Sequence, residues 1–170
     1  NRIIYQFYQR NDFHSHLGEE KPHFDLEIKE HLVYAKFLNA SDHPTIEKKI
    51  QSKDYYNFFI GNDESKWASD VRAYHEVTYQ DLYDGINLMF FEKEGQLKYE
   101  YILSPGADAN EIQLAYYGVK GIKKTKAGGL RVIGALGEIM EEKPYAYQIK
   151  NGKIVEIPCE FVVSNKNEVS

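Results

Sequence analysis

A glycine turn joins two apolar segments in residues 87–103, which read Asn87-Leu-Met-Phe-Phe-Glu-Lys-Glu-Gly95-Gln-Leu-Lys-Tyr-Glu-Tyr-Ile-Leu103. Leucine or tyrosine occupies every odd position from 97 to 103, and polar residues occupy positions 96, 98 and 100. This period of two is typical of a strand with one buried face. A type I turn followed by a left-handed glycine over residues 93–95 would pair Phe91 with Leu97. The segment therefore predicts an antiparallel hairpin with a three-residue loop.

Two further glycine turns, at residues 135–137 and 150–152, separate short apolar runs in the same way. Three-residue loops would pair Ile133 with Ile139 and Tyr147 with Val155. At the second turn a two-residue Asn-Gly loop is the alternative, but it would place the apolar residues of the two strands on opposite faces. We therefore predict three-residue loops at both turns.

The rest of the chain shows frequent turn signals and no long helical periodicity, which indicates an all-β fold. Ile46 and Ile50 are four residues apart, so residues 44–53 are predicted to form helical turns, and Asp63 is predicted to cap a short turn through Trp67. We expect an antiparallel β-sandwich with short helical turns only, and a partly open β-barrel is the alternative. No internal boundary is evident, so a single β-rich domain over residues 1–170 is predicted. Further strands are expected at residues 1–8, 32–38, 73–79 and 112–117.

The composition excludes several classes of protein. The chain has 170 residues, of which 42% are hydrophobic and 14% aromatic, so it is not disordered. It carries 21 Lys and Arg against 26 Asp and Glu, and the net charge of −5 argues against electrostatic binding of nucleic acid. No run approaches the ~18–20 apolar residues of a membrane span. The single cysteine excludes an internal disulfide.

The chain begins at Asn1, without a methionine or a basic and apolar leader, and its first eight residues already have the composition of a strand. We therefore expect it to be a fragment of a longer multidomain protein.

Motifs of nucleophilic, phosphate-binding and metal-dependent catalysis are absent from the sequence. We accordingly predict no catalytic residue and no cofactor. His14 and His16 are candidates for a metal site, because a His-x-His pair on a strand points both rings the same way. No spacing fixes a set of ligands around them, so a solvated polar loop is the preferred interpretation and no metal is predicted.

An aromatic group is the candidate binding site. Tyr55, Tyr56 and Trp67 stand close in sequence, with Phe58 and Phe59 between them. Exposed rings of this kind stack on sugars or anchor a partner protein, whereas buried rings would belong to a core. Both interpretations remain open. The single cysteine, Cys159, shares its parity with neighbouring apolar residues and is predicted to be a core residue.

Four segments carry a resemblance to a known family. They are residues 56–71 (Tyr-Asn-Phe-Phe-Ile-Gly-Asn-Asp-Glu-Ser-Lys-Trp-Ala-Ser-Asp-Val), 74–88 (Tyr-His-Glu-Val-Thr-Tyr-Gln-Asp-Leu-Tyr-Asp-Gly-Ile-Asn-Leu), 95–108 (Gly-Gln-Leu-Lys-Tyr-Glu-Tyr-Ile-Leu-Ser-Pro-Gly-Ala-Asp) and 142–148 (Glu-Lys-Pro-Tyr-Ala-Tyr-Gln). Over about residues 55–163 the chain resembles an uncharacterised domain near the N-terminus of very large secreted bacterial proteins. In these proteins, many of them gliding-motility-associated or cell-surface proteins, the domain precedes β-propeller-type repeats, immunoglobulin-like modules and a sorting domain. The resemblance implies an extracellular or cell-surface location and supplies no catalytic residue.

These observations together predict a non-catalytic module of a secreted or cell-surface bacterial protein, acting in adhesion, assembly or binding. Its expected partners are a surface glycan, a protein or neighbouring domains of the same chain. A carbohydrate-binding β-sandwich is the alternative, and a carboxylate hydrolase is a third hypothesis.

Overall fold

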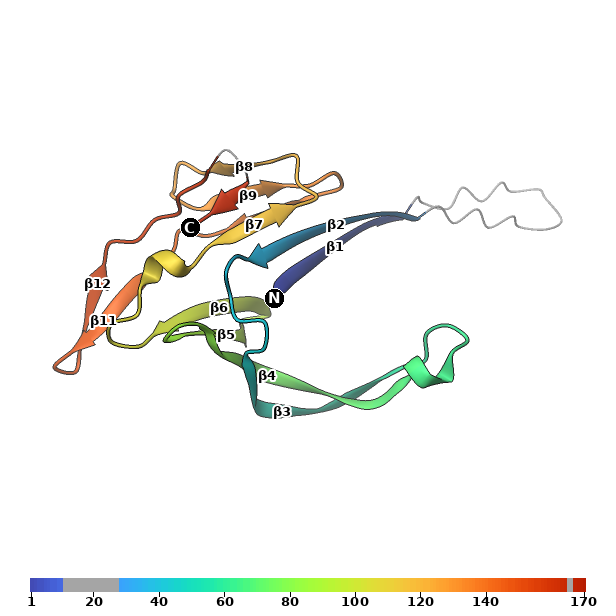
Figure 1. Ribbon diagram of the computed structural model, residues 1–170. Helices are drawn as coiled ribbons and strands as arrows, with labels where there is room; N and C mark the ends of the chain where they lie inside the picture. Colours follow the sequence, from blue (N-terminus) through green and yellow to red (C-terminus); the bar gives the residue numbers. More distant parts are fainter. Residues whose placement is uncertain (11–27, 165–166) are drawn as a thin grey trace. The chain divides into compact units, whose positions relative to one another are not determined.

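The computed structural model describes residues 1–10, 28–164 and 167–170, and in this part of the chain the secondary structure is antiparallel strands with two short 3-10 helices (Figure 1). The prediction of an all-β fold with short helical turns only is confirmed. The chain divides into two compact units, residues 1–38 with 112–170 (unit 1) and residues 39–111 (unit 2). That residues 1–170 form a single domain stays a prediction.

Unit 1 contains a four-stranded antiparallel sheet in the order β1-β2-β7-β13. Strand β2 pairs along its length with β1, and its last four residues also pair with β7. The strands are β1 (Arg2–Arg10), β2 (Ile28–Phe37), β7 (Leu114–Tyr117) and β13 (Glu168–Val169).

A three-stranded sheet and a separate hairpin complete unit 1. The sheet has the order β10-β9-β8, and the hairpin is a two-stranded sheet of its own. The strands are β8 (Gly121–Lys124), β9 (Leu130–Ile133), β10 (Glu138–Glu141), β11 (Ala146–Lys150) and β12 (Lys153–Ile157).

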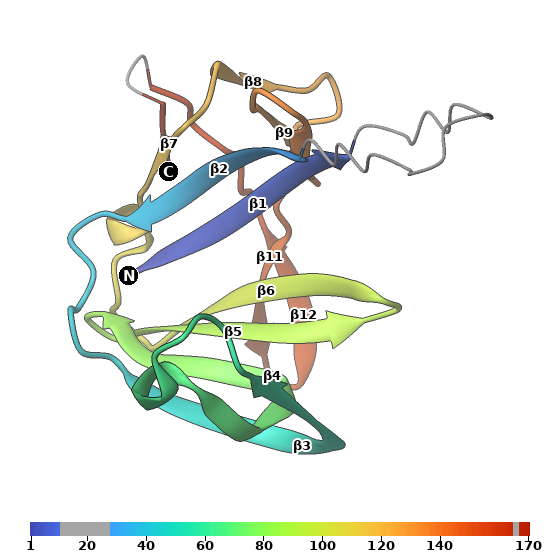
Figure 2. The same cartoon turned by 90° about the vertical axis from the view of Figure 1, so that its right-hand side faces the viewer.

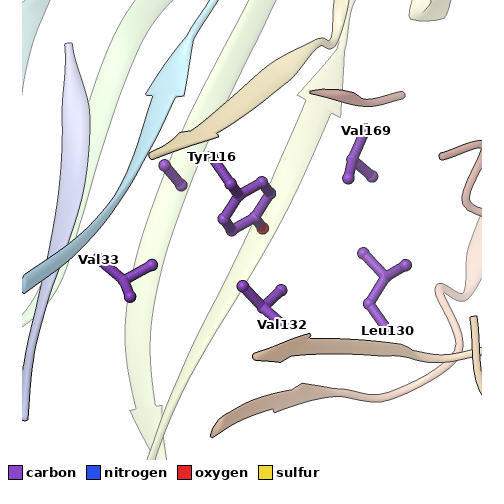
Figure 3. Close-up of a cluster of buried hydrophobic side chains, with 6 residues drawn as sticks. Val33, Tyr116, Leu130, Val132 and Val169 are labelled. Carbon is purple, nitrogen blue, oxygen red and sulfur yellow. The ribbon is translucent and has the colours of Figure 1, made fainter. Parts of the chain in front are cut away.

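The core of unit 1 lies between its two larger sheets. Val33 and Ala35 come from β2, Tyr116 from β7 and Val169 from β13, and these side chains meet Leu130 and Val132 of β9. Figure 3 shows the side chains converging from strands on both sides. This is a sandwich-like arrangement, in which alternate residues of facing sheets fill one layer. Among the described strands no sheet closes on itself, so the alternative of a partly open barrel is not realised.

Unit 2 contains one four-stranded antiparallel sheet in the order β3-β4-β5-β6, which Figure 2 shows as a twisted sheet. A row of aromatic rings crosses it: the centroids of Tyr79 and Phe90 are 6.0 Å apart, those of Phe90 and Tyr99 6.1 Å, and those of Tyr99 and Tyr101 6.0 Å. Such tilted and edge-to-face contacts stabilise neighbouring strands beyond the area that they bury. The strands are β3 (Thr45–Phe58), β4 (Ala68–Tyr83), β5 (Ile86–Lys93) and β6 (Gln96–Leu103).

The hairpin loops differ from the prediction. Lys93 pairs with Gln96, and Lys150 pairs with Lys153, so both loops have two residues instead of three. Their central residues all have positive φ, 56° and 75° at Glu94 and Gly95 and 52° and 73° at Asn151 and Gly152. This is the type I′ turn, whose twist matches that of the flanking strands. The local turn geometry therefore overrides the matching of apolar faces on which the prediction rested.

The third turn was also predicted in the wrong register. Ile139 pairs with Val132 instead of Ile133, and the amide of Gly134 donates to the carbonyl oxygen of Gly137 at 2.9 Å. Gly134 and Gly137 therefore close this turn, and the loop between them consists of Ala135 and Leu136.

The helical turns predicted for residues 44–53 are wrong, because residues 45–53 are part of β3 and Ile46 pairs with Tyr79 of β4. Strand pairing overrides the four-residue spacing of two isoleucines. The cap at Asp63 is confirmed: its carboxylate accepts from the amide of Ser65 at 3.2 Å, at the start of the 3-10 helix η1 (Glu64–Lys66). The second 3-10 helix is η2 (Ala109–Glu111).

The prediction that Cys159 is a core residue is wrong, because its side chain is exposed. Strand β12 ends at Ile157 and Pro158 follows. The alternation that assigned Cys159 to an apolar face therefore ends before it reaches the cysteine.

Candidate functional site

The candidate site is the part of β3 and β4 that extends beyond β5. Strand β4 pairs with β5 only from Glu76 onward, so its residues 68–75 pair with β3 alone. We call residues 51–74, which include the loop between the two strands, the distal ribbon (Figure 1). Its exposed large apolar side chains, with their exposed fractions, are Tyr55 56%, Tyr56 55%, Phe58 45%, Phe59 60%, Ile60 75%, Trp67 39% and Val71 37%.

Two irregularities shape this ribbon. The pairing shifts between Gln51 and Tyr55 and again between Tyr56 and Phe58. At the second shift Asp70 has a φ of 55°, and its amide donates to Oδ1 of Asn57 at 3.0 Å. Bulges of this kind increase the twist of a ribbon and redirect its side chains.

The aromatic side chains lie on both faces of the ribbon. Tyr55 pairs with Arg72 and Tyr56 pairs with Val71, so the two adjacent tyrosines point to opposite faces. The guanidinium carbon of Arg72 lies 5.2 Å from the centroid of the Tyr55 ring, within the range of a cation–π contact. The ring of Tyr56 lies 6.4 Å from that of Phe58 with an angle of 28° between their planes.

Contacts within the chain stabilise the loop end of the ribbon. The rings of Phe59 and Trp67 meet edge to face with centroids 5.5 Å apart. Nε1 of Trp67 donates to the carbonyl oxygen of Gly61 at 3.1 Å. The hydroxyl of Ser65 donates to Asp63 at 2.6 Å, and Nζ of Lys66 lies 3.3 Å from the same carboxylate.

These donors lower the pKa of Asp63, the hydrogen bond from Ser65 being the largest cause and the one from Lys66 the next. The Asp63 carboxylate is therefore ionised at neutral pH with its acceptor groups already engaged. The apolar surface of the ribbon end is presented by a loop in which Asp63, Ser65 and Lys66 are paired with one another.

A second exposed aromatic surface lies on the β11–β12 hairpin of unit 1. The rings of Tyr145 and Tyr147 are 5.7 Å apart with an angle of 31° between their planes, and they are 63% and 47% exposed. Ile149 and Ile154 pair beside them and are 71% and 66% exposed. This surface was not predicted from the sequence, although the alternation of residues 145, 147 and 149 before an Asn-Gly turn was a usable signal.

A partly buried polar cluster lies in unit 1. The hydroxyl of Tyr116 donates to Oε1 of Glu141 at 2.9 Å. Burial raises the pKa of Tyr5 to about 12, and the charge of Glu141 adds to this effect. The hydrogen bond from Tyr116 to Glu141 joins β7 to β10.

Tyr55, Tyr56 and Trp67 all lie on the distal ribbon, but the structure does not bring them into one site: the two tyrosines point to opposite faces and Trp67 lies at the loop end. Whether they bind a ligand stays a prediction. His14 and His16 lie outside the described residues. In the described ranges, no group of three or more His, Cys, Asp or Glu side chains is arranged to hold a metal ion. None of the described helices has the length and apolar character needed to cross a membrane.

Comparison with known proteins assigns the chain to a family without assigning a function. No curated protein and no solved structure matches it. A family model described as a domain of unknown function (DUF7948) matches residues 1–170. The chain therefore belongs to the family of this domain of unknown function, DUF7948.

Proposed function

We propose that this domain is a non-catalytic binding module of a larger secreted or cell-surface bacterial protein, and that the distal ribbon attaches it to a partner in adhesion or assembly. The observation that carries the proposal is the set of seven exposed large apolar side chains between residues 55 and 71. The extracellular location and the multidomain parent come from the resemblance of residues 55–163 to N-terminal domains of large secreted proteins.

Physical chemistry supports a partner for this ribbon. A large aromatic side chain buries about 150–250 Å² on contact, and each Å² of apolar surface removed from water contributes about 25 cal/mol. A two-stranded ribbon is at best marginally stable alone in water. The distal ribbon therefore gains stability when a partner covers its rings, and that gain is available as binding energy.

The arrangement of the rings favours a protein partner for this surface. Tyr55 and Tyr56 point to opposite faces, and Phe59 and Trp67 occupy the loop end. A sugar chain stacks along one face, whereas a protein surface can enclose both faces and the end. Aromatic side chains are also the residues that most often dominate protein interfaces.

The test is adhesion and surface assembly by the full-length protein that carries the domain. We expect the double variant Tyr56→Ser/Phe59→Ser to lose adhesion or assembly while its thermal unfolding stays close to that of the wild type. The matched control is Leu97→Ser, in the same unit but outside the distal ribbon, which removes a side chain that is 69% exposed. If the double variant adheres and assembles like the control, the ribbon is not the binding surface.

The Tyr145–Tyr147 pair supports carbohydrate binding as a second candidate function. The two rings are exposed and within 31° of parallel, an arrangement that can stack on consecutive sugars. A glycan array with the wild-type domain and with Tyr145→Ala/Tyr147→Ala tests it. Hits that disappear in the variant support a glycan site, and an array without hits removes it.

A further inference from the structure

We propose that the partner of the distal ribbon is a second copy of this chain, with the β4 strands of the two copies lying antiparallel about a two-fold axis at Val71. This inference rests on the proposed role of the ribbon as the binding surface. It deepens that role by naming the partner and the residues at the centre of the contact.

The unpaired edge of β4 determines where the two-fold axis can lie. Residues 68–72 of β4 are all exposed, and residues 68–75 have no pairing partner on the side where β5 would continue. This edge of β4 can accept the same edge of another copy. Two-fold contacts, in which the same patch meets itself, are the commonest form of self-association.

The second argument is charge complementarity. Asp70 and Arg72 stand on either side of Val71, with opposite charges at equal distances from it along the strand. In an antiparallel arrangement about Val71, Asp70 of each copy lies next to Arg72 of the other. Within one chain the two groups already form an ion pair at 2.5 Å, with 63% and 36% of their side chains exposed. Association would therefore join two existing pairs into a four-charge cluster instead of burying isolated charges.

The third argument is area. Five rings that are between 39% and 60% exposed hold roughly 500 Å² of apolar surface, taking about 200 Å² for each full ring. Ile60 and Val71 add to this surface. The smaller specific interfaces bury about 600 Å² on each partner. The ribbon thus holds apolar surface of the order that such an interface buries, and a contact along β4 covers the part of it that lies next to that strand.

The fourth argument is that the ribbon end is already ordered. Trp67 donates a hydrogen bond to the carbonyl oxygen of Gly61 and contacts the ring of Phe59. The carboxylate of Asp63 is paired with Ser65 and Lys66. A surface ordered before binding avoids much of the entropy cost of association. The positive φ of Asp70 interrupts a regular strand edge, so side-chain packing and the charge cluster hold the dimer in place of a continuous ladder of hydrogen bonds.

Cysteine cross-linking tests the position of the axis. In the Cys159→Ser background, Val71→Cys places one thiol at the proposed axis, and mild oxidation at low micromolar concentration should produce a disulfide-linked dimer. The matched control is Ile149→Cys in the same background, at a position that is 71% exposed and lies in unit 1. Cross-linking at position 71 that exceeds the control by tenfold or more supports the proposal. Equal cross-linking at both positions, or none at position 71, overturns it.

Charge reversal gives a second readout that needs no cysteine. The wild-type chain should have twice the mass of one chain by light scattering at high micromolar concentration. Arg72→Glu and Asp70→Lys should each be monomeric, and their equimolar mixture should form a dimer. A wild-type chain that stays monomeric, or single variants that dimerise like the wild type, would overturn the proposal. If the chain is monomeric but the Tyr56→Ser/Phe59→Ser variant loses adhesion, the distal ribbon remains the binding surface and its partner is a different protein.

Discussion

Leu130→Ala is expected to destabilise unit 1 by about 3–4 kcal/mol, because Leu130 is fully buried at the centre of the sandwich. The side chain comes from the three-stranded sheet and belongs to the cluster that includes Val33 and Tyr116 of the opposite sheet. Truncation loses the transfer free energy of three carbon atoms and leaves a cavity that two hydrogen-bonded sheets cannot collapse to fill. Given a total stability of about 5–15 kcal/mol, this is a large fraction of the whole.

Urea denaturation followed by far-UV circular dichroism is the assay. The midpoint should move to lower urea with the slope unchanged, and the melting temperature should fall by about 10 °C for a chain of this size. Ile149→Ala is the control, since Ile149 is 71% exposed in the same unit, and a surface substitution of this kind should change stability by only about 0.5 kcal/mol. A loss below about 1 kcal/mol for Leu130→Ala would refute the reasoning that the two sheets share one close-packed core.

Tyr5→Phe tests the pKa of about 12 that Tyr5 has in the folded chain, which exceeds the ordinary tyrosine value of 10.0. Between pH 10 and pH 12 the unfolded chain loses the Tyr5 proton, whereas the folded chain keeps it. The folded state therefore loses about 2–3 kcal/mol of stability as the pH rises from 10 to 12, and this stability is fully present below pH 10. The Tyr5→Phe variant lacks this proton, so its free energy of unfolding in urea should fall less than that of the wild type between pH 10 and pH 12. The same pH dependence in both proteins would contradict the raised pKa of Tyr5. Gly118→Ala should destabilise by about 3 kcal/mol or more, because its φ is 73° and a Cβ there would overlap the carbonyl oxygen of Leu32. Gly152→Ala has the same φ of 73° and open space around it, so it should cost only about 1–2 kcal/mol, and equal losses at the two glycines would contradict the importance of the overlap.

The fold class could be predicted from the sequence because the alternation of residues 97–103 persists whatever the register of the hairpin. Leu97, Tyr99 and Tyr101 do share one face, opposite Leu88 and Phe90 in the structure. The register itself was predicted incorrectly because it was chosen to match apolar faces. At the β11–β12 hairpin neither face is buried, so face matching has no force there and the Asn151-Gly152 turn decides the pairing.

The helical turns at residues 44–53 were predicted incorrectly for a related reason. A spacing of four between Ile46 and Ile50 is helical only if both residues face one core. In the structure both are exposed on an edge strand, 49% and 67%, and Ile50 has a φ of 55° at the base of the distal ribbon. Local spacing carries no information about which strand will pair with the segment.

The candidate site was found in part. Tyr55, Tyr56 and Trp67 were recognisable as a group because they are close in sequence. Their exposure was not predictable, since it depends on where β5 stops pairing with β4, at Glu76 and Phe91. Had β5 continued along β4, the same residues would have lain on the two faces of a wider sheet.

The accessibility of Trp67 decides whether the distal ribbon is the surface through which the chain associates. It is the single tryptophan of the chain, it lies at the loop end of the distal ribbon and it is 39% exposed, so its fluorescence reports on this surface alone. Acrylamide quenching is measured in the dilute chain and in the concentrated, associated chain, with Arg72→Glu as the dissociated control. We expect quenching to decrease and the emission to shift to shorter wavelength on association, with no change in the control. Association that leaves the quenching of Trp67 unchanged would contradict the account.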